Sequence, residues 1–255
     1  MDNRLTTPIK CISQEGLKLL ACLTMLIDHI GAVLVYAAYL QAWDAGNYAV
    51  SNSLVPVYQA MRIIGRIAFP IYCFLLVEGF HHTRDVKKYM KRLAVGVLLS
   101  EIPFDLAFSG YIDWESSSVM VTLLLGCGMM VCMERLKDWR KYVVIAPFFL
   151  LAEWLRTDYA GNGIAIIVML YLTRGIPYEK LWRTAGFLVL LWFGASVQIG
   201  SLEIPMELFG LIALIPIFAY DGRKLTGSKW IQWGFYLFYP VHLLVLWALE
   251  AVLYG

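Results

Sequence analysis

The chain has 255 residues, of which 60% are hydrophobic and only 16% are charged. A soluble domain has about a quarter of its residues charged, so this chain has too few polar side chains to cover a globule in water. The formal net charge of +2 gives no case for nucleic acid as a partner. The composition therefore indicates an integral membrane protein.

Apolar segments follow one another along the chain at the spacing of membrane helices. A spanning helix needs about 20 apolar residues because the hydrocarbon layer is about 30 Å thick. We therefore predict an all-α, polytopic helical bundle of about nine spans, with residues 1–255 as one domain. The two shortest segments, 142–155 and 163–173, would also fit one re-entrant broken helix. The predicted spans are 17–40, 60–80, 92–109, 118–133, 142–155, 163–173, 184–199, 203–220 and 231–253.

The first sixteen residues are polar and lack the apolar core and cleavage site of a signal peptide. Segment 17–40 is therefore expected to stay in the mature protein as an anchor. The cysteines are interpreted as small apolar fillers, and no metal site is expected. They are Cys11, Cys22, Cys73, Cys127 and Cys132.

Basic residues alternate between the predicted loops. Eighteen of the 21 Lys and Arg lie on one side of the predicted membrane: before the first span, in every second loop between spans, or at the adjoining span ends, where Lys18 and Arg92 lie. These loops join spans 2–3, 4–5, 6–7 and 8–9. The other loops, 41–59, 110–117, 156–162 and 200–202, carry one, Arg156. Lys and Arg concentrate on the cytoplasmic side of membrane proteins. The N-terminus is therefore predicted inside and the C-terminus outside.

Two arginines and two carboxylates fall inside predicted spans. Arg62 and Arg66 are four residues apart and so share one face of the second span, as Glu101 and Asp105 do on the third. A charge at mid-bilayer costs about 2.5–3.5 kcal/mol, so it persists when paired or when it lines a cavity. Ion pairs between these spans and a polar chamber for substrate are both consistent with this pattern. Pro103 is expected to open the third span.

Asp28 and His29 lie in the middle of the first span. Adjacent helix positions point about 100° apart, so the two side chains should face different neighbours. A mid-membrane His beside a carboxylate is a candidate general base, because imidazole titrates near neutral pH. A neutral His satisfied by a backbone or hydroxyl group is the structural alternative.

Further polar residues lie in the second and last spans. Tyr239 and His242 flank Pro240 in the last span, and Glu78 lies near the inner end of the second, before His81 and His82. The two histidines are expected at the interface instead of around a metal. Carboxylates near predicted span ends are expected to reach headgroups: Glu153, Glu207 and Glu250.

Four strings of residues resemble the TraX family. They are LKLLACLTMLIDHIGAVL (17–34), MRIIGRIAFPIYCFLLVEGFHHTRDVKKYMKRL (61–93), LLSEIPFDLAF (98–108) and FYLFYPVHLLVLWAL (235–249). Residues 110–230 match more loosely, chiefly through DYAGNG. The namesake of this family acetylates the amino end of a pilin subunit, and the family is similar to membrane acyltransferases that use cytoplasmic acetyl-CoA.

The resemblance implies a catalytic histidine on the first span, which is His29 here, with Asp28 orienting an imidazole or pairing with an arginine. His29 would deprotonate the acceptor or carry the acetyl group. The polar residues of these spans are the candidate binding residues for acetyl-CoA, the co-substrate, and for a peptide or small-molecule acceptor: Arg62, Arg66, Glu78, Glu101, Asp105, Tyr239 and His242. The implied location is the bacterial cytoplasmic membrane, with the lipid bilayer as a partner.

Two other functions remain open at this stage. A proton-coupled transporter would use Asp28, Glu101 and Asp105 as relay sites, although no internal repeat is visible. A non-enzymatic membrane scaffold would use every buried charge structurally. The acceptor, the acyl chain length and the oligomeric state are left open by the residues.

Overall fold

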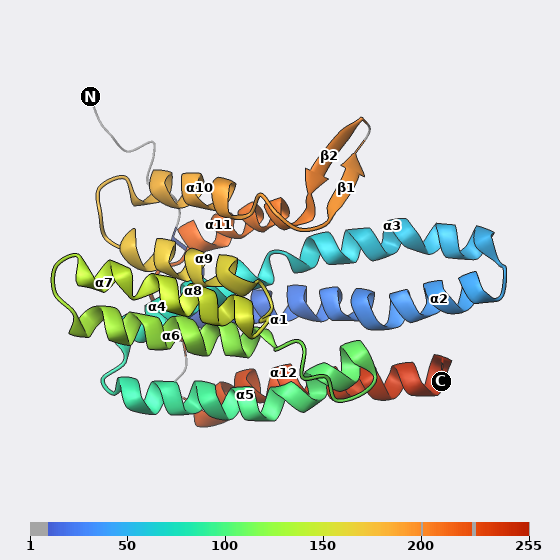
Figure 1. The fold of residues 1–255 in the computed structure, drawn as a ribbon, viewed down its shortest axis with the longest axis horizontal. Coiled ribbons are helices and arrows are strands. Elements are labelled where there is room, and N and C mark those ends of the chain that lie inside the picture. The colour runs from blue at the N-terminus through green and yellow to red at the C-terminus, as the bar shows by residue number, and fades with distance from the viewer. Residues whose placement is uncertain (1–9, 200, 226–227, 255) are drawn as a thin grey trace.

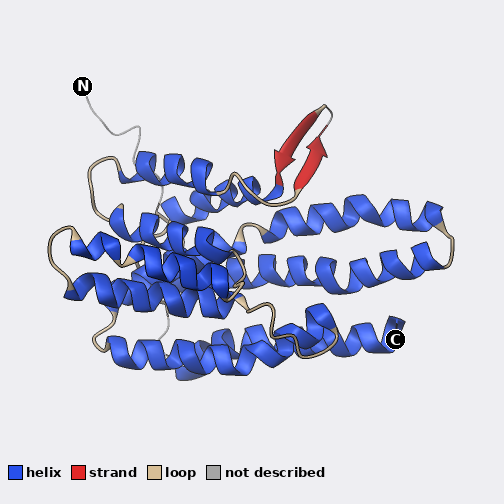
Figure 2. Ribbon diagram, in the orientation of Figure 1, coloured by secondary structure: helices blue, strands red, loops and turns tan. Residues whose placement is uncertain are grey.

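The computed structural model describes residues 10–199, 201–225 and 228–254, and it is nearly all helical. Most helices lie along one long axis (Figure 1). Figure 2 shows that a two-stranded hairpin projects from one flank. The predicted helical class is confirmed, with this hairpin as the exception. Arg4, one of the basic residues assigned to the inner side, lies outside the described residues.

The predicted first span is one continuous helical rod. The hydroxyl of Ser13 caps its start by accepting a 3.1 Å hydrogen bond from the backbone N–H of Gly16. A π-helical turn begins two residues after His29, and such turns are frequent at functional sites. The rod consists of α1 (Gln14–Ile30), η1 (Gly31–Val35) and α2 (Tyr36–Asp44).

The predicted loop 41–59 is wrong, because most of it is helical. The chain turns only at 45–47, and the Asn47 side chain caps the next helix by accepting from the N–H of Val50 at 3.3 Å. The polar Ser51 is accommodated because its hydroxyl donates back to the helix backbone. The second span thus becomes two consecutive helices, α3 (Tyr48–Gly65) and α4 (Ala68–His82).

Helices from distant parts of the chain pack side by side. α5 lies along α12, and its other neighbour is α6 (Figure 1). Pro103 lies inside α5 without ending it, so the expected opening of this helix is not observed. The bounds are α5 (Val86–Ser109), α6 (Val119–Arg135) and α12 (Lys229–Tyr254).

The two short apolar segments in the middle of the chain fold as separate helices that pack together. The turn between them has positive φ at three residues with side chains: Arg156 (47°), Tyr159 (65°) and Ala160 (43°). Ser117 holds this turn, because it donates to the carbonyl of Arg156 and accepts from the N–H of Asp158. The helices are α7 (Arg140–Val143), α8 (Ile145–Trp154) and α9 (Ala160–Leu172).

The predicted spans 184–199 and 203–220 differ most from the structure. The first is helical only to Leu190, and both include a strand of an antiparallel hairpin in which Ser196 lies opposite Pro205. β-Branched residues favour strands, and the helical interpretation of 196–199 is wrong. The elements are α10 (Glu179–Leu190), β1 (Ser196–Ile199), β2 (Leu202–Pro205), η2 (Met206–Ala213) and α11 (Leu214–Phe218).

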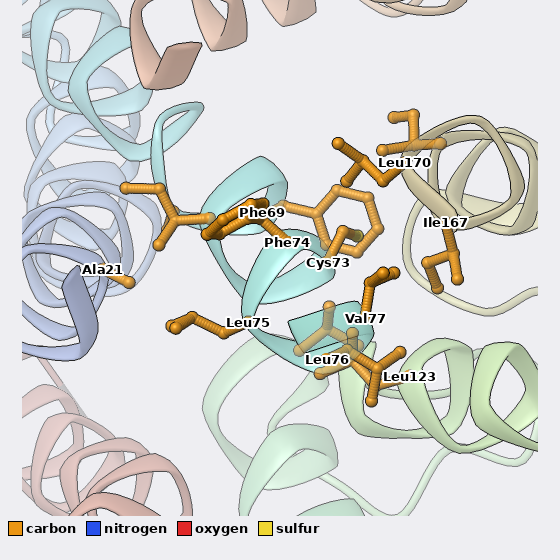
Figure 3. Close-up of a cluster of buried hydrophobic side chains, with 14 of the residues drawn as sticks. Ala21, Phe69, Cys73, Phe74, Leu75, Leu76, Val77, Leu123, Ile167 and Leu170 are labelled. Carbon is orange, nitrogen blue, oxygen red and sulfur yellow. The ribbon is translucent and has the colours of Figure 1, made fainter. Parts of the chain in front are cut away.

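The helix α4 lies at the centre of the hydrophobic core. Figure 3 shows it surrounded by α1, α6 and α9, which contribute Ala21, Leu123 and Ile167. Side chains of α4 are buried on all its faces, as expected for a helix enclosed by protein. This central helix fixes the positions of the residues just before it, including Arg66.

Three helical stretches are long and apolar enough to cross a membrane: Gln14–Asp44, Tyr48–His82 and Trp230–Tyr254. Shorter apolar helices occur at Ala160–Leu172 and Met206–Phe218. These stretches support a membrane protein, whereas about nine spans and their sidedness remain predictions. The basic loops α4–α5, α6–α7 and α9–α10 lie at the same end of the long axis (Figure 1).

Candidate functional site: a buried polar centre

A buried cluster of charges joins α1, α3 and η2. Arg66 donates to Asp28 at 2.9 Å and to Glu207 at 2.6 Å, and Arg62 donates to Asp28 at 2.7 Å. The Nε of Arg66 donates to the carbonyl of Arg62, so every guanidinium nitrogen of Arg66 has an acceptor. Asp28, Arg66 and Glu207 are 7%, 8% and 9% exposed. Such complete pairing is what makes a buried charge tolerable.

Gly65 allows α3 to approach α1 closely enough for these ion pairs. A Cβ atom at this position would lie 2.1 Å from Oδ1 of Asp28 and 2.3 Å from its Cβ. Real Cβ atoms essentially never lie so close to another atom. A side chain at position 65 would therefore displace Asp28 from the guanidinium groups.

The expected pairing of Asp28 with the arginines is confirmed, whereas the alternative of ion pairs between the arginines and the third span is wrong. Glu101 bonds the hydroxyl and the backbone N–H of Ser118, and Asp105 is buried with no hydrogen-bond partner for its Oδ1 atom among the described residues. The reason is packing: α5 lies against α12 and α6, whereas Arg62 and Arg66 face α1 and η2. The second and third predicted spans are therefore not neighbours at this depth.

His29 faces α12 instead of the charge cluster. Its Nδ1 atom lies 2.7 Å from Nε2 of His242, and the rings are within 9° of parallel. Nδ1 of His242 lies 2.7 Å from the carbonyl oxygen of Phe238. The rings of Phe108 and Tyr239 pack edge-on against His29. As expected from the helix geometry, Asp28 and His29 contact different neighbours.

Three groups at this centre were not predicted as site residues. Glu207 pairs with Arg66 instead of reaching headgroups, because η2 turns back into the bundle. The hydroxyl of Tyr159 contacts Glu207, and Asp158 lies within electrostatic reach of Arg66. The DYAGNG string at 158–163 was the available signal for the last two.

Asp158 gives the cluster an accessible side. Asp158 is exposed at the surface of the protein. The protein around its carboxyl group nevertheless displaces enough water to raise the pKa of Asp158 to about 6, while the positive charge of Arg66 opposes this rise. Tyr159 and Ala160, which follow Asp158 in this turn, both have positive φ. Strained backbone of this kind is concentrated at functional sites.

A cavity of about 430 Å³ lies between α1, α4, α5, α6 and α12. Its middle is largely apolar, and Tyr239 lines it at the buried end. The Tyr239 ring centroid lies 6.1 Å from that of His29, so the cavity reaches the edge of the histidine pair. The basic side chains that line its other end are Lys18, Arg92 and Lys224.

Glu78 is not brought together with the other predicted site residues. It accepts a 2.8 Å hydrogen bond from Arg174, and His82 contacts its backbone carbonyl. It lies twelve positions after Arg66, mostly along α4, which is roughly 18 Å. His81 stacks on Tyr171. This second cluster fastens α4 to the loop after α9.

The polar centre can perform proton transfer next to fixed positive charge. An imidazole can accept a proton near neutral pH, and a guanidinium can stabilise a developing oxyanion. Among the described residues, no group of three or more His, Cys, Asp or Glu could hold a metal ion. The fold and the site thus define a helical membrane protein with ionisable side chains held inside its bundle.

Comparison with known proteins gives the family. Residues 13–250 match the TraX protein family, and the chain therefore belongs to the TraX family. It is 28% identical over 249 residues to a probable fimbrial assembly protein FimC, serogroup H1, of Dichelobacter nodosus, covering 90% of this chain and 92% of that one. It is 22% identical to an uncharacterized protein of Rickettsia prowazekii (strain Madrid E), covering 91% and 90%. No solved structure matches.

Proposed function

We propose that this protein is a membrane acetyltransferase that uses acetyl-CoA and acetylates an amine or hydroxyl, most suitably a peptide amino terminus. The cavity between the basic residues and the histidine pair carries this proposal. A CoA thioester has matching polarity, with anionic phosphates at one end, a long neutral arm, and a reactive carbonyl at the other. Lys18, Arg92 and Lys224 would hold the phosphates while the thioester reaches Tyr239.

The opposite side of the polar centre suits a cationic acceptor. The Oε2 atom of Glu207 is buried and lacks a hydrogen-bond partner among the described residues. Three carboxylates, those of Asp28, Glu207 and Asp158, lie near two guanidinium groups, so one negative charge is uncompensated once Asp158 ionises. A protonated amine would supply both a donor and the missing positive charge.

The relative from Dichelobacter nodosus supports an exported peptide as acceptor, because its name is that of a fimbrial assembly protein. We therefore take a pilin-like subunit with a free amino end as the best candidate. The proposed setting is the bacterial cytoplasmic membrane, which the chain crosses about nine times with its basic loops inside. The thioester would then enter from the cytoplasm and the amine from the outer side.

In the proposed reaction, His29 acts as the general base. The bound ammonium first releases one proton to water and becomes a neutral amine. Its nitrogen then gives a second proton to His29 as it attacks the thioester carbonyl carbon, and the carbon–sulfur bond breaks. The sulfur takes up the proton from His29, so the products are an acetamide and CoA with a free thiol. Arg62 and Arg66 would stabilise the oxyanion, and Asp28 holds both in place.

Binding of CoA tests the proposal without requiring turnover. Calorimetry in lipid nanodiscs should show that CoA binds, and that Lys18→Gln, Arg92→Gln and Lys224→Gln together weaken binding at least about tenfold. The matched control removes the same charge from the α6–α7 region through Arg135→Gln, Lys137→Gln and Arg140→Gln, outside the cavity lining. The control variant should bind CoA normally.

Two outcomes would reject the proposed function. One is wild-type protein that does not bind CoA, and the other is an equal loss of affinity in both triple variants, which would mean that the cavity is not the site. Uptake of a solute into proteoliposomes without consumption of acetyl-CoA would favour the transporter instead.

A further inference from the structure

We propose that His242 is a positioning residue that fixes the tautomer of His29 and leaves its Nε2 atom free to accept a proton. The inference assigns His242 a task within the proposed acetyl transfer, and to that extent depends on it. The tautomer itself is a property of the resting protein, so it can be tested when no acetyl transfer takes place.

The chain of hydrogen bonds starts at the backbone of α12. Nδ1 of His242 lies 2.7 Å from the carbonyl oxygen of Phe238, four residues earlier on the same helix. A carbonyl oxygen can only accept a hydrogen bond, so this nitrogen of His242 carries the proton and donates. A neutral imidazole has one N–H, and Nε2 of His242 is therefore an acceptor.

The acceptor nitrogen of His242 in turn determines the tautomer of His29. Nε2 of His242 lies 2.7 Å from Nδ1 of His29, and as an acceptor it requires a proton on that atom. Nε2 of His29 is then unprotonated in the neutral pair. No hydrogen bond joins this atom to another protein group in the described part of the chain. His29 is thus arranged as a base with one open position.

Protonation of His29 would strengthen the arrangement. When Nε2 takes a proton from the acceptor, the Nδ1–H of His29 becomes a charge-assisted donor to His242, and such hydrogen bonds are roughly twice as strong as neutral ones. The rings of Phe108 and Tyr239 pack edge-on against His29 and restrict its rotation. His242 therefore positions the imidazole of His29 without touching the substrate.

A metal site does not explain this pair. Two nitrogen ligands at 2.0–2.1 Å from a tetrahedral zinc ion would be separated by roughly 3.3 Å, whereas these nitrogens are 2.7 Å apart. A shared hydrogen fits the shorter distance. Both rings are also nearly parallel, which keeps the two nitrogens in line across α1 and α12.

Nitrogen-15 solid-state NMR of histidine-labelled protein in lipid bilayers measures the tautomers directly. The chain has four histidines, so the signals of His29 and His242 are assigned by their loss in His29→Gln and His242→Gln. We expect both rings as Nδ1–H tautomers in the wild type. A His29 ring protonated on Nε2 and bare on Nδ1 would overturn the inference, whether or not the protein transfers acetyl groups.

Kinetics then separate positioning from packing. His242→Gln offers an oxygen near the former Nε2 position that can accept from His29, whereas His242→Phe keeps a ring but has no acceptor. We expect kcat to fall about 10–100-fold in the Phe variant, with most of it restored by Gln and KM for acetyl-CoA unchanged. Equal activities in the two variants would contradict the role of His242. If the Phe variant does not fold, the NMR result decides.

Discussion

Arg66 links three elements that are far apart in the sequence. It donates hydrogen bonds to Asp28 on α1 and to Glu207 on η2. Arg66 and Glu207 are 141 positions apart in the sequence. Removing one partner from a buried ionic network leaves an uncompensated charge and costs about 3–5 kcal/mol. The sequence predicted a buried arginine with Asp28 as a partner. It did not predict Glu207, because only the fold brings η2 back to the centre.

Arg66→Met should destabilise the protein much more than Glu207→Gln. The Met variant leaves Glu207 without its ion pair and Asp28 with Arg62 alone, at about 3–5 kcal/mol. The Gln variant keeps an acceptor for Arg66 and should cost about 1–2 kcal/mol. Denaturant unfolding in mixed micelles measures both. The control is Arg156→Met, which removes an exposed ion pair with Glu115 and should cost under about 1 kcal/mol. Comparable losses for Arg66→Met and Arg156→Met would show that the cluster does not stabilise the fold.

Among the elements, α1 and α3 determine the geometry of the polar centre. Their close approach depends on Gly65, and the π-helical turn of η1 begins directly after α1, two residues beyond His29. The lengths of the apolar segments predicted the α1–α2 rod, α5, α6 and α12 well. It missed the early start of α3 and the β hairpin, because capping by Asn47 and strand pairing at 196–205 are decided by local polar contacts that hydropathy ignores.

Substitution of two helical glycines tests the close approach. Gly65→Ala places a methyl group against Asp28 and should lower the free energy of unfolding by at least about 1–3 kcal/mol, which is the usual cost of overpacking. Gly234→Ala in α12 meets no atom within 4 Å and should be neutral or stabilise by up to about 1 kcal/mol. Thermal unfolding of both variants in the same lipid nanodiscs measures the difference. Equal melting temperatures would mean that α3 moves freely away from α1.

Across the whole molecule, the polar centre is approached from two sides. The cavity reaches it through Tyr239, and the accessible Asp158 flanks it elsewhere. The sequence located most of the ionisable residues at this centre, since each is costly inside a membrane. The alternative of pairing Arg62 and Arg66 with α5 is wrong, because α3 and α5 do not pack together at the polar centre. The cavity could not be predicted, since it arises from five helices packing together.

Acetyl transfer from one side of a membrane to the other tests most directly the claim that this protein is a membrane acetyltransferase. Proteoliposomes containing a peptide with a free amino terminus in their lumen are supplied with labelled acetyl-CoA outside, and the lumenal peptide is examined by mass spectrometry. The wild type should acetylate the peptide, whereas His29→Ala should bind CoA normally and lose at least about 100-fold of the rate. Lumenal peptide left unmodified by wild-type protein that binds CoA, or acetylated equally by His29→Ala, would contradict the account.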